Sequence, residues 1–151
     1  MSPTPQILVV EDDDAIRALL VAALRREPFD IHAAANGSQA LNMTKTTQYA
    51  VILLDLMMPM LNGLEFLEAF HELFPKSRSV VFVMTAGDDT ALRHLPSNMV
   101  HGIVRKPFDV PQLVAMVREV ALTRGAHTSE TTTETGIAEM AGEGPQADPP
   151  N

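Results

Sequence analysis

The 151-residue chain contains no cysteine, which excludes a disulfide-bonded scaffold, a zinc ribbon and a thiol redox site. It is also poor in basic residues, with 11 lysines and arginines against 19 aspartates and glutamates and a net charge of −8. This balance argues against nucleic acid as the main partner, because phosphate binding requires a basic surface. A chain of this length is typical of one domain and can bury a core without covalent cross-links.

Long apolar runs and nucleotide-binding loops are missing as well. The longest apolar runs have the length of strands, well short of the ~18–20 residues that span a bilayer. The first residues, MSPTPQ, lack the basic and then apolar pattern of a secretory signal, so we expect a cytoplasmic protein with no membrane partner. Neither a GxGxxG nor a GxxxxGKS/T loop is present, so a nucleotide cofactor has no support.

Much of the acidity lies near the C-terminal end of the sequence. Residues 125–151 contain five acids and no lysine or arginine, whereas residues 1–124 carry a balance of only −3. The segment 125–151 is rich in Thr, Gly, Pro and Glu, and its only larger aliphatic residues are Ile137 and Met140. Because it cannot bury enough apolar surface to offset the entropy of ordering, we expect it to be disordered and residues 1–124 to form the folded domain.

Within residues 6–123, apolar strand-like runs alternate with amphipathic helical segments. The runs are apolar throughout, which is typical of parallel strands covered on both faces. The alternation predicts an α/β, doubly wound (βα)5 sandwich with helices on both faces of a five-stranded parallel sheet. Pro96 limits the fourth helix, which should be short. The expected strands are 7–10, 29–33, 50–54, 80–84 and 102–105. The expected helices begin near Asp13 or Asp14, and near Asn36, Asn62, Asp88 and Asp109.

Polar side chains follow four of the expected strands at their carboxyl ends, namely Glu11 and Asp12, Asp55, Thr85 and Lys106. In open parallel sheets, ligands bind outside this edge. Three carboxylates that meet there repel one another, and a hard cation such as Mg²⁺ relieves the repulsion. An amine and a hydroxyl can stabilise an added oxygen anion, so the set suits a carboxylate that accepts a phosphoryl group.

Four stretches resemble the receiver domains of two-component response regulators, in this order: ILVVEDDDAIR (7–17), VILLDLMMPMLNGLEFL (51–67), VVFVMTAG (80–87) and VRKPFD (104–109). The resemblance as a whole spans roughly residues 6–123, and each of the four stretches lies at an expected strand end. The resemblance implies a flavodoxin-like fold with strand order 2-1-3-4-5. It also implies a signalling phospho-acceptor rather than a classical enzyme, one that catalyses its own phosphorylation and dephosphorylation and receives its phosphoryl group from a histidine kinase or histidine phosphotransferase.

The resemblance also implies which residues form the phosphorylation and metal site. Asp55 corresponds to the phospho-acceptor and to one Mg²⁺ ligand. Asp12 corresponds to a direct ligand of the metal, and Glu11 to a residue that acts through water. The backbone carbonyl of Met57 corresponds to the last ligand that the protein supplies.

A second group of residues corresponds to the family's switch. Thr85 would swing toward the phosphoryl group, and Lys106 would pair with it. The Lys106-Pro107 bond resembles the family's cis peptide. Ile103 stands where the family usually has Tyr or Phe, an aromatic residue that moves inward when the threonine follows the phosphoryl group. We therefore expect the movement of Thr85 to be transmitted differently here.

Three functions compete at this point. The first is a stand-alone receiver, monomeric or weakly dimeric, that signals to a downstream protein target or a phosphorelay, since we expect no output domain after Arg124. The second is a pseudo-receiver, a protein-binding module that is not phosphorylated; Ile103 and Pro96 leave this alternative open. The third, an aspartate-nucleophile phosphatase, is disfavoured because Asp55-Leu56-Met57 lacks the second carboxylate of an Asp-x-Asp motif.

Overall fold

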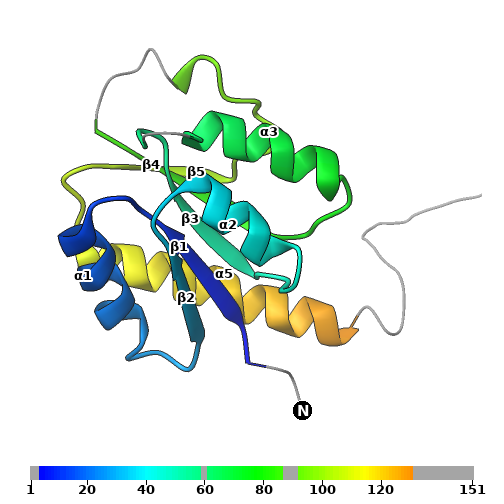
Figure 1. Ribbon diagram of the computed structural model, residues 1–151. Helices are drawn as coiled ribbons and strands as arrows, with labels where there is room; N and C mark the ends of the chain where they lie inside the picture. Colours follow the sequence, from blue (N-terminus) through cyan, green and yellow to red (C-terminus); the bar gives the residue numbers. More distant parts are fainter. Residues whose placement is uncertain (1–3, 59–60, 87–91, 131–151) are drawn as a thin grey trace, which may run out of the picture.

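The computed structural model describes residues 4–58, 61–86 and 92–130 (Figure 1). Its centre is a parallel sheet with strand order β2-β1-β3-β4-β5, which confirms the predicted fold class and order. The strands are β1 (Gln6–Val10), β2 (Asp30–Ala34), β3 (Val51–Asp55), β4 (Val80–Thr85) and β5 (Gly102–Arg105). The described helices are α1 (Asp14–Leu24), α2 (Gly37–Thr44), α3 (Gly63–Leu73) and α5 (Val110–Glu130).

The central strands are buried because helices cover both faces of the sheet, as Figure 1 shows. Side chains alternate between the faces along a strand. Leu53 therefore packs in the core that includes Leu20 of α1 and Val117 of α5. Its neighbour Leu54 packs in the other core, with Phe66 of α3. The same two-sided burial explains why these strands are apolar at every position.

Helix starts agree well with the cap residues read from the sequence. The side chains of Asp13, Asn36 and Asp109 each accept a hydrogen bond from a backbone N–H of the first turn, at 2.8–3.0 Å. At α3, Asn62 and Glu65 form a full capping box. At α2 the box is incomplete, because the Gln39 side chain accepts from the N–H of residue 35 instead of the N-cap N–H.

Two regions differ from the expectation or fall outside it. Helix α5 continues to Glu130, so its last residues lie in the segment predicted to be disordered. Residues 131–151, and residues 88–91 of the helix expected to begin near Asp88, lie outside the described residues. None of the helices in the described part of the chain has both the length and the apolar character needed to cross a bilayer.

Candidate functional site

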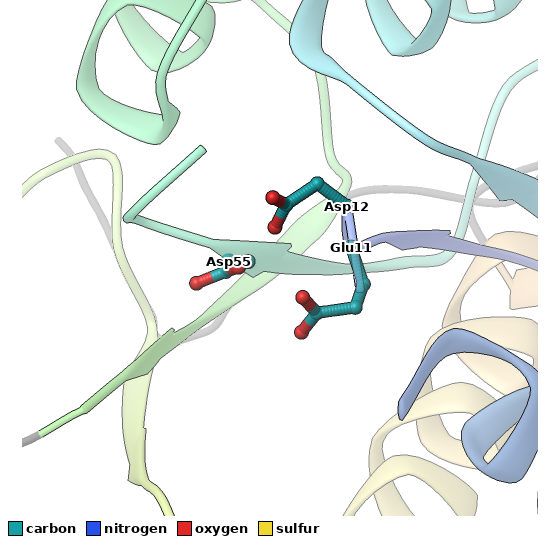
Figure 2. A group of neighbouring side chains, drawn as sticks. All are labelled: Glu11, Asp12 and Asp55. Carbon is teal, nitrogen blue, oxygen red and sulfur yellow. The ribbon is translucent and has the colours of Figure 1, made fainter. Parts of the chain in front are cut away.

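Three carboxylates converge at the carboxyl edge of the sheet (Figure 2). Glu11 and Asp12 directly follow β1, and Asp55 ends the neighbouring strand β3. One oxygen from each residue lies within 4.8 Å of the others. Glu11 and Asp55 are buried whereas Asp12 is exposed, so the group opens to solvent on the side of Asp12. The predicted acidic group is thus brought together as the strand order requires.

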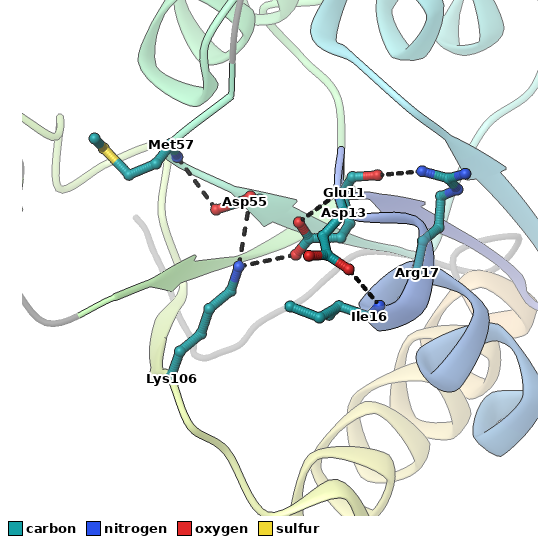
Figure 3. Close-up of polar contacts among 7 residues, drawn as sticks. All are labelled: Glu11, Asp13, Ile16, Arg17, Asp55, Met57 and Lys106. Atoms are coloured by element: carbon teal, nitrogen blue, oxygen red, sulfur yellow. Dashed lines mark hydrogen bonds and ion pairs between the residues drawn. The ribbon is translucent and has the colours of Figure 1, made fainter.

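Lys106 supplies the positive charge that faces these acids (Figure 3). Its Nζ lies 2.9 Å from Glu11 Oε1 and 3.5 Å from Asp55 Oδ2. The residue follows β5, and its backbone N–H donates to the Thr85 carbonyl at 2.7 Å. The Lys106–Pro107 peptide bond is cis, as the resemblance implied. Lys106 therefore contacts Glu11 more closely than it contacts the predicted phospho-acceptor.

Backbone N–H groups fix one oxygen of each buried carboxylate. The Asp13 N–H donates to Glu11 Oε2 at 3.1 Å, and the Met57 N–H donates to Asp55 Oδ1 at 3.2 Å (Figure 3). Each carboxylate thus has one oxygen facing the backbone and the other facing Lys106. The Met57 side chain points into solvent and is 65% exposed. The assignment of the Met57 carbonyl as a metal ligand stays a prediction.

Burial and the neighbouring acid strongly perturb Asp55. Desolvation, and then the hydrogen bond and the negative charge of Glu11, raise the pKa of Asp55 to about 7, while Met57 and Lys106 act in the opposite direction. Desolvation lowers the pKa of Lys106, but its contacts with Glu11 and Asp55 outweigh this and leave the pKa above its ordinary value. The lysine therefore stays charged, and the acids carry charge that an added cation can neutralise.

The two predicted switch residues differ in their surroundings. Thr85 ends β4 and is buried, one strand away from Asp55. Ile103 lies on β5, the edge strand, paired in register with Val83, and its side chain is 49% exposed. An apolar side chain of this size thus lies half in solvent on the strand next to Thr85. The switch roles of Thr85 and Ile103 stay predictions.

Sequence reasoning did not identify Arg17 as part of the site. Its Nη1 donates to the Glu11 backbone carbonyl at 2.9 Å, and its Nη2 pairs with Asp14 (Figure 3). A cation in the first turns of a helix is unfavourable with respect to the helix dipole. An arginine at this unfavourable position, shortly after an acidic strand end, is the feature of the sequence that could have indicated a role for Arg17 in the site.

The donor set fits a magnesium ion. Carboxylate oxygens are the ligands that Mg²⁺ prefers, and the ion usually keeps several waters. Here two buried carboxylates and an exposed third one offer such oxygens within 4.8 Å of one another, and the exposed side leaves room for water. Among the residues that the structure describes, no histidine or cysteine belongs to this group, so a softer metal such as zinc fits it less well.

The chain matches the family model of the response regulator receiver domain over residues 7–118. It is 35% identical over 129 residues to the transcriptional regulatory protein SrrA of Staphylococcus aureus, a match that covers 85% of this chain and 51% of SrrA. The chain thus spans about half the length of the curated relatives it matches.

Two solved structures illustrate the likeness of fold. The receiver domain of Francisella response regulator 1452 is 25% identical, with a TM-score of 0.69 over 80% of this chain and 99% of that one. The Vibrio cholerae chemotaxis protein CheY4 is 23% identical, with a TM-score of 0.70 over 78% and 99% of the two chains. Because the family model covers most of the chain and the fold agrees, the chain belongs to the receiver domain family of two-component response regulators.

Proposed function

We propose that Asp55 accepts a phosphoryl group from a phosphohistidine, presented by a histidine kinase or a histidine phosphotransferase. The observation that carries this proposal is the position of the Asp55 carboxylate, at the carboxyl edge of the sheet between a second buried carboxylate and the Lys106 amine. A structural aspartate at a strand end has no need for such surroundings, which raise its pKa to about 7.

The transfer exchanges one bond to phosphorus for another. An Asp55 carboxylate oxygen attacks the phosphorus and forms an O–P bond, the N–P bond of phosphohistidine breaks, and its electron pair stays on the imidazole nitrogen. Lys106 lies within 3.5 Å of Asp55 and stabilises negative charge on the phosphoryl oxygens. Thr85, at the end of the next strand, donates a hydrogen bond to the same group. Water later attacks this phosphorus and releases phosphate, which restores the carboxylate.

Asp12 and Asp55 would hold Mg²⁺ directly, Glu11 through water, and Met57 through its carbonyl. The bound ion would neutralise charge on the carboxylates and on the phosphoryl oxygens. The chain's own residues prepare this site, because the Asp13 and Met57 N–H groups hold Glu11 and Asp55 in place before any ligand arrives. Lys106 would compete with the metal for the negative charge of Glu11 and Asp55.

We further propose that the signal leaves through a protein partner or onward phosphotransfer. The relatives that the chain matches are called transcriptional regulatory proteins, but the match covers about half of their length. Residues 125–151 carry five acids and no lysine or arginine, which does not suit contact with DNA. A cytoplasmic location and a monomeric or weakly dimeric state belong to the same proposal.

Binding of a phosphoryl mimic tests the proposed acceptor. The chain is titrated with beryllofluoride in the presence and absence of Mg²⁺ and followed by fluorine NMR. We expect a bound signal that requires Mg²⁺ and is lost in Asp55→Asn. The matched control is Asp30→Asn, at the exposed amino-terminal end of β2, which should bind like the wild type. A wild-type chain that binds no beryllofluoride would instead favour the pseudo-receiver.

A further inference from the structure

Arg17 contacts the acidic site through the backbone rather than through a carboxylate of that site. It lies on the first turns of α1, where long side chains point back toward the start of the helix. Its Nη1 therefore reaches the Glu11 carbonyl, at 2.9 Å, while Nη2 pairs with the exposed Asp14 (Figure 3). The Arg17 side chain is only 23% exposed, although the side chain of Asp14 is 90% exposed.

The Glu11 carbonyl belongs to the peptide unit that joins Glu11 to Asp12. The orientation of this peptide unit sets the direction in which the Asp12 side chain leaves the backbone. The other polar groups of Glu11 are held as well: its N–H donates to the residue 34 carbonyl at 3.1 Å, and its carboxylate binds the Asp13 N–H and Lys106. Arg17 completes this set by holding the carbonyl.

Asp12 depends on such support because it is exposed. Its exposed side chain is not enclosed by the core, so its position follows from the backbone that carries it. A planar guanidinium can bind the carbonyl and Asp14 at once in a fixed geometry, which a lysine ammonium cannot do. An ion pair as exposed as Arg17–Asp14 contributes little by itself. The contact with the Glu11 carbonyl is therefore the interaction that gives Arg17 a role in the site.

We propose that Arg17 is a positioning residue, which orients Asp12 toward the metal site by holding the Glu11 carbonyl. The inference rests on the proposed function, because it takes the group of Glu11, Asp12 and Asp55 to bind Mg²⁺. It adds Arg17, which lies outside that group, and predicts whether its removal strengthens or weakens Mg²⁺ binding. Electrostatics alone would make removal of a nearby cation strengthen Mg²⁺ binding, whereas loss of positioning weakens it.

The test is the Mg²⁺ dissociation constant of the full chain, measured by isothermal titration calorimetry. Arg17→Met removes the hydrogen bond and the charge but keeps an unbranched side chain, and we expect about tenfold weaker binding, the usual scale for supports of metal ligands. Arg25→Met makes the same change at the exposed far end of α1 and should stay within about twofold of the wild type. Binding by Arg17→Met as tight as the wild type, or tighter, would overturn the proposal.

A second variant and a second readout separate positioning from general stability. Arg17→Lys keeps the charge without the planar fork, and we expect it to bind Mg²⁺ more weakly than the wild type by about threefold or more. Exchange of the Asp13 amide should also be faster in both variants before metal is added, since the turn is held less firmly. Wild-type affinity and unchanged exchange in Arg17→Lys would contradict the proposal, even where Arg17→Met fails to fold. A wild-type chain without Mg²⁺ affinity would overturn the proposed metal site itself.

Discussion

At the scale of the residue, Asp55 carries a charge that its surroundings oppose. Burial and the negative charge of Glu11 raise its pKa from the ordinary 3.8 to about 7. The folded protein therefore holds a proton on Asp55 more tightly than the unfolded chain does. Under that condition the free energy of unfolding is highest below the ordinary pKa and falls as pH rises through the interval up to about 7.

The raised pKa of Asp55 predicts that stability falls as pH rises. In EDTA, the wild type should lose on the order of 1–3 kcal/mol of unfolding free energy between about pH 4 and pH 8, measured by urea denaturation. Asp55→Asn removes the titrating group, so most of this loss should disappear and the variant should be the more stable protein at pH 8. Parallel pH profiles for the two proteins would show that Asp55 does not carry the effect.

Lys106 is held by the same carboxylates that are proposed to bind Mg²⁺, at 2.9 Å from Glu11 and 3.5 Å from Asp55. Lys106→Met should therefore strengthen Mg²⁺ binding, because an ammonium group no longer competes with the metal for the charge of these carboxylates. In EDTA, the same substitution should lower the free energy of unfolding by about 2 kcal/mol or more, since two buried acids lose the cation beside them. Calorimetry and urea denaturation measure the two effects, and weaker Mg²⁺ binding in this variant would contradict the competition.

At the scale of the element, the start of α3 is held by the capping box of Asn62 and Glu65. Asn62→Ala should lower the free energy of unfolding by about 1 kcal/mol, because the N–H of Glu65 loses its partner. Asn42→Ala, on the exposed surface of α2, is the matched control and should change stability by less than about 0.5 kcal/mol. Equal losses in the two variants would mean that the cap contributes nothing specific.

The elements were predictable where local chemistry decides them. The strands are apolar runs, and the helix starts at Asp13, Asn62 and Asp109 rest on hydrogen bonds between near neighbours in sequence. The strand-end rule also indicated where the acids meet. The end of α5 was not predictable from composition, since the helix continues to Glu130 through a polar segment.

Sequence patterns could not predict which individual groups of the site contact one another. The preference of Lys106 for Glu11 over Asp55 depends on how side chains that follow or end β1, β3 and β5 are placed, and residues 11 and 106 are 95 positions apart. The contact of Arg17 with a backbone carbonyl has no side-chain partner that a motif could reveal. Residue types at strand ends thus predict which groups meet but not which pairs form.

At the scale of the whole molecule, two cores on opposite faces share one sheet. Leu53 and Leu54 are adjacent in β3 yet belong to different cores, and both are fully buried. Leu53→Ala and Leu54→Ala should therefore each cost about 2–5 kcal/mol in urea denaturation. Leu122→Ala, at a position 50% exposed on α5, should cost less than about 1 kcal/mol. A small loss at only one of the two strand positions would show that its face is not tightly packed.

The central claim is that Asp55 accepts a phosphoryl group, and its most direct measurement is the intact mass of the chain after incubation with acetyl phosphate and Mg²⁺. We expect the wild type and Asp30→Asn to gain the mass of one phosphoryl group, and EDTA to prevent the gain. Asp55→Asn should show no gain under the same conditions. A phosphoryl group that still appears in Asp55→Asn, or a wild-type mass that never changes, would contradict the account.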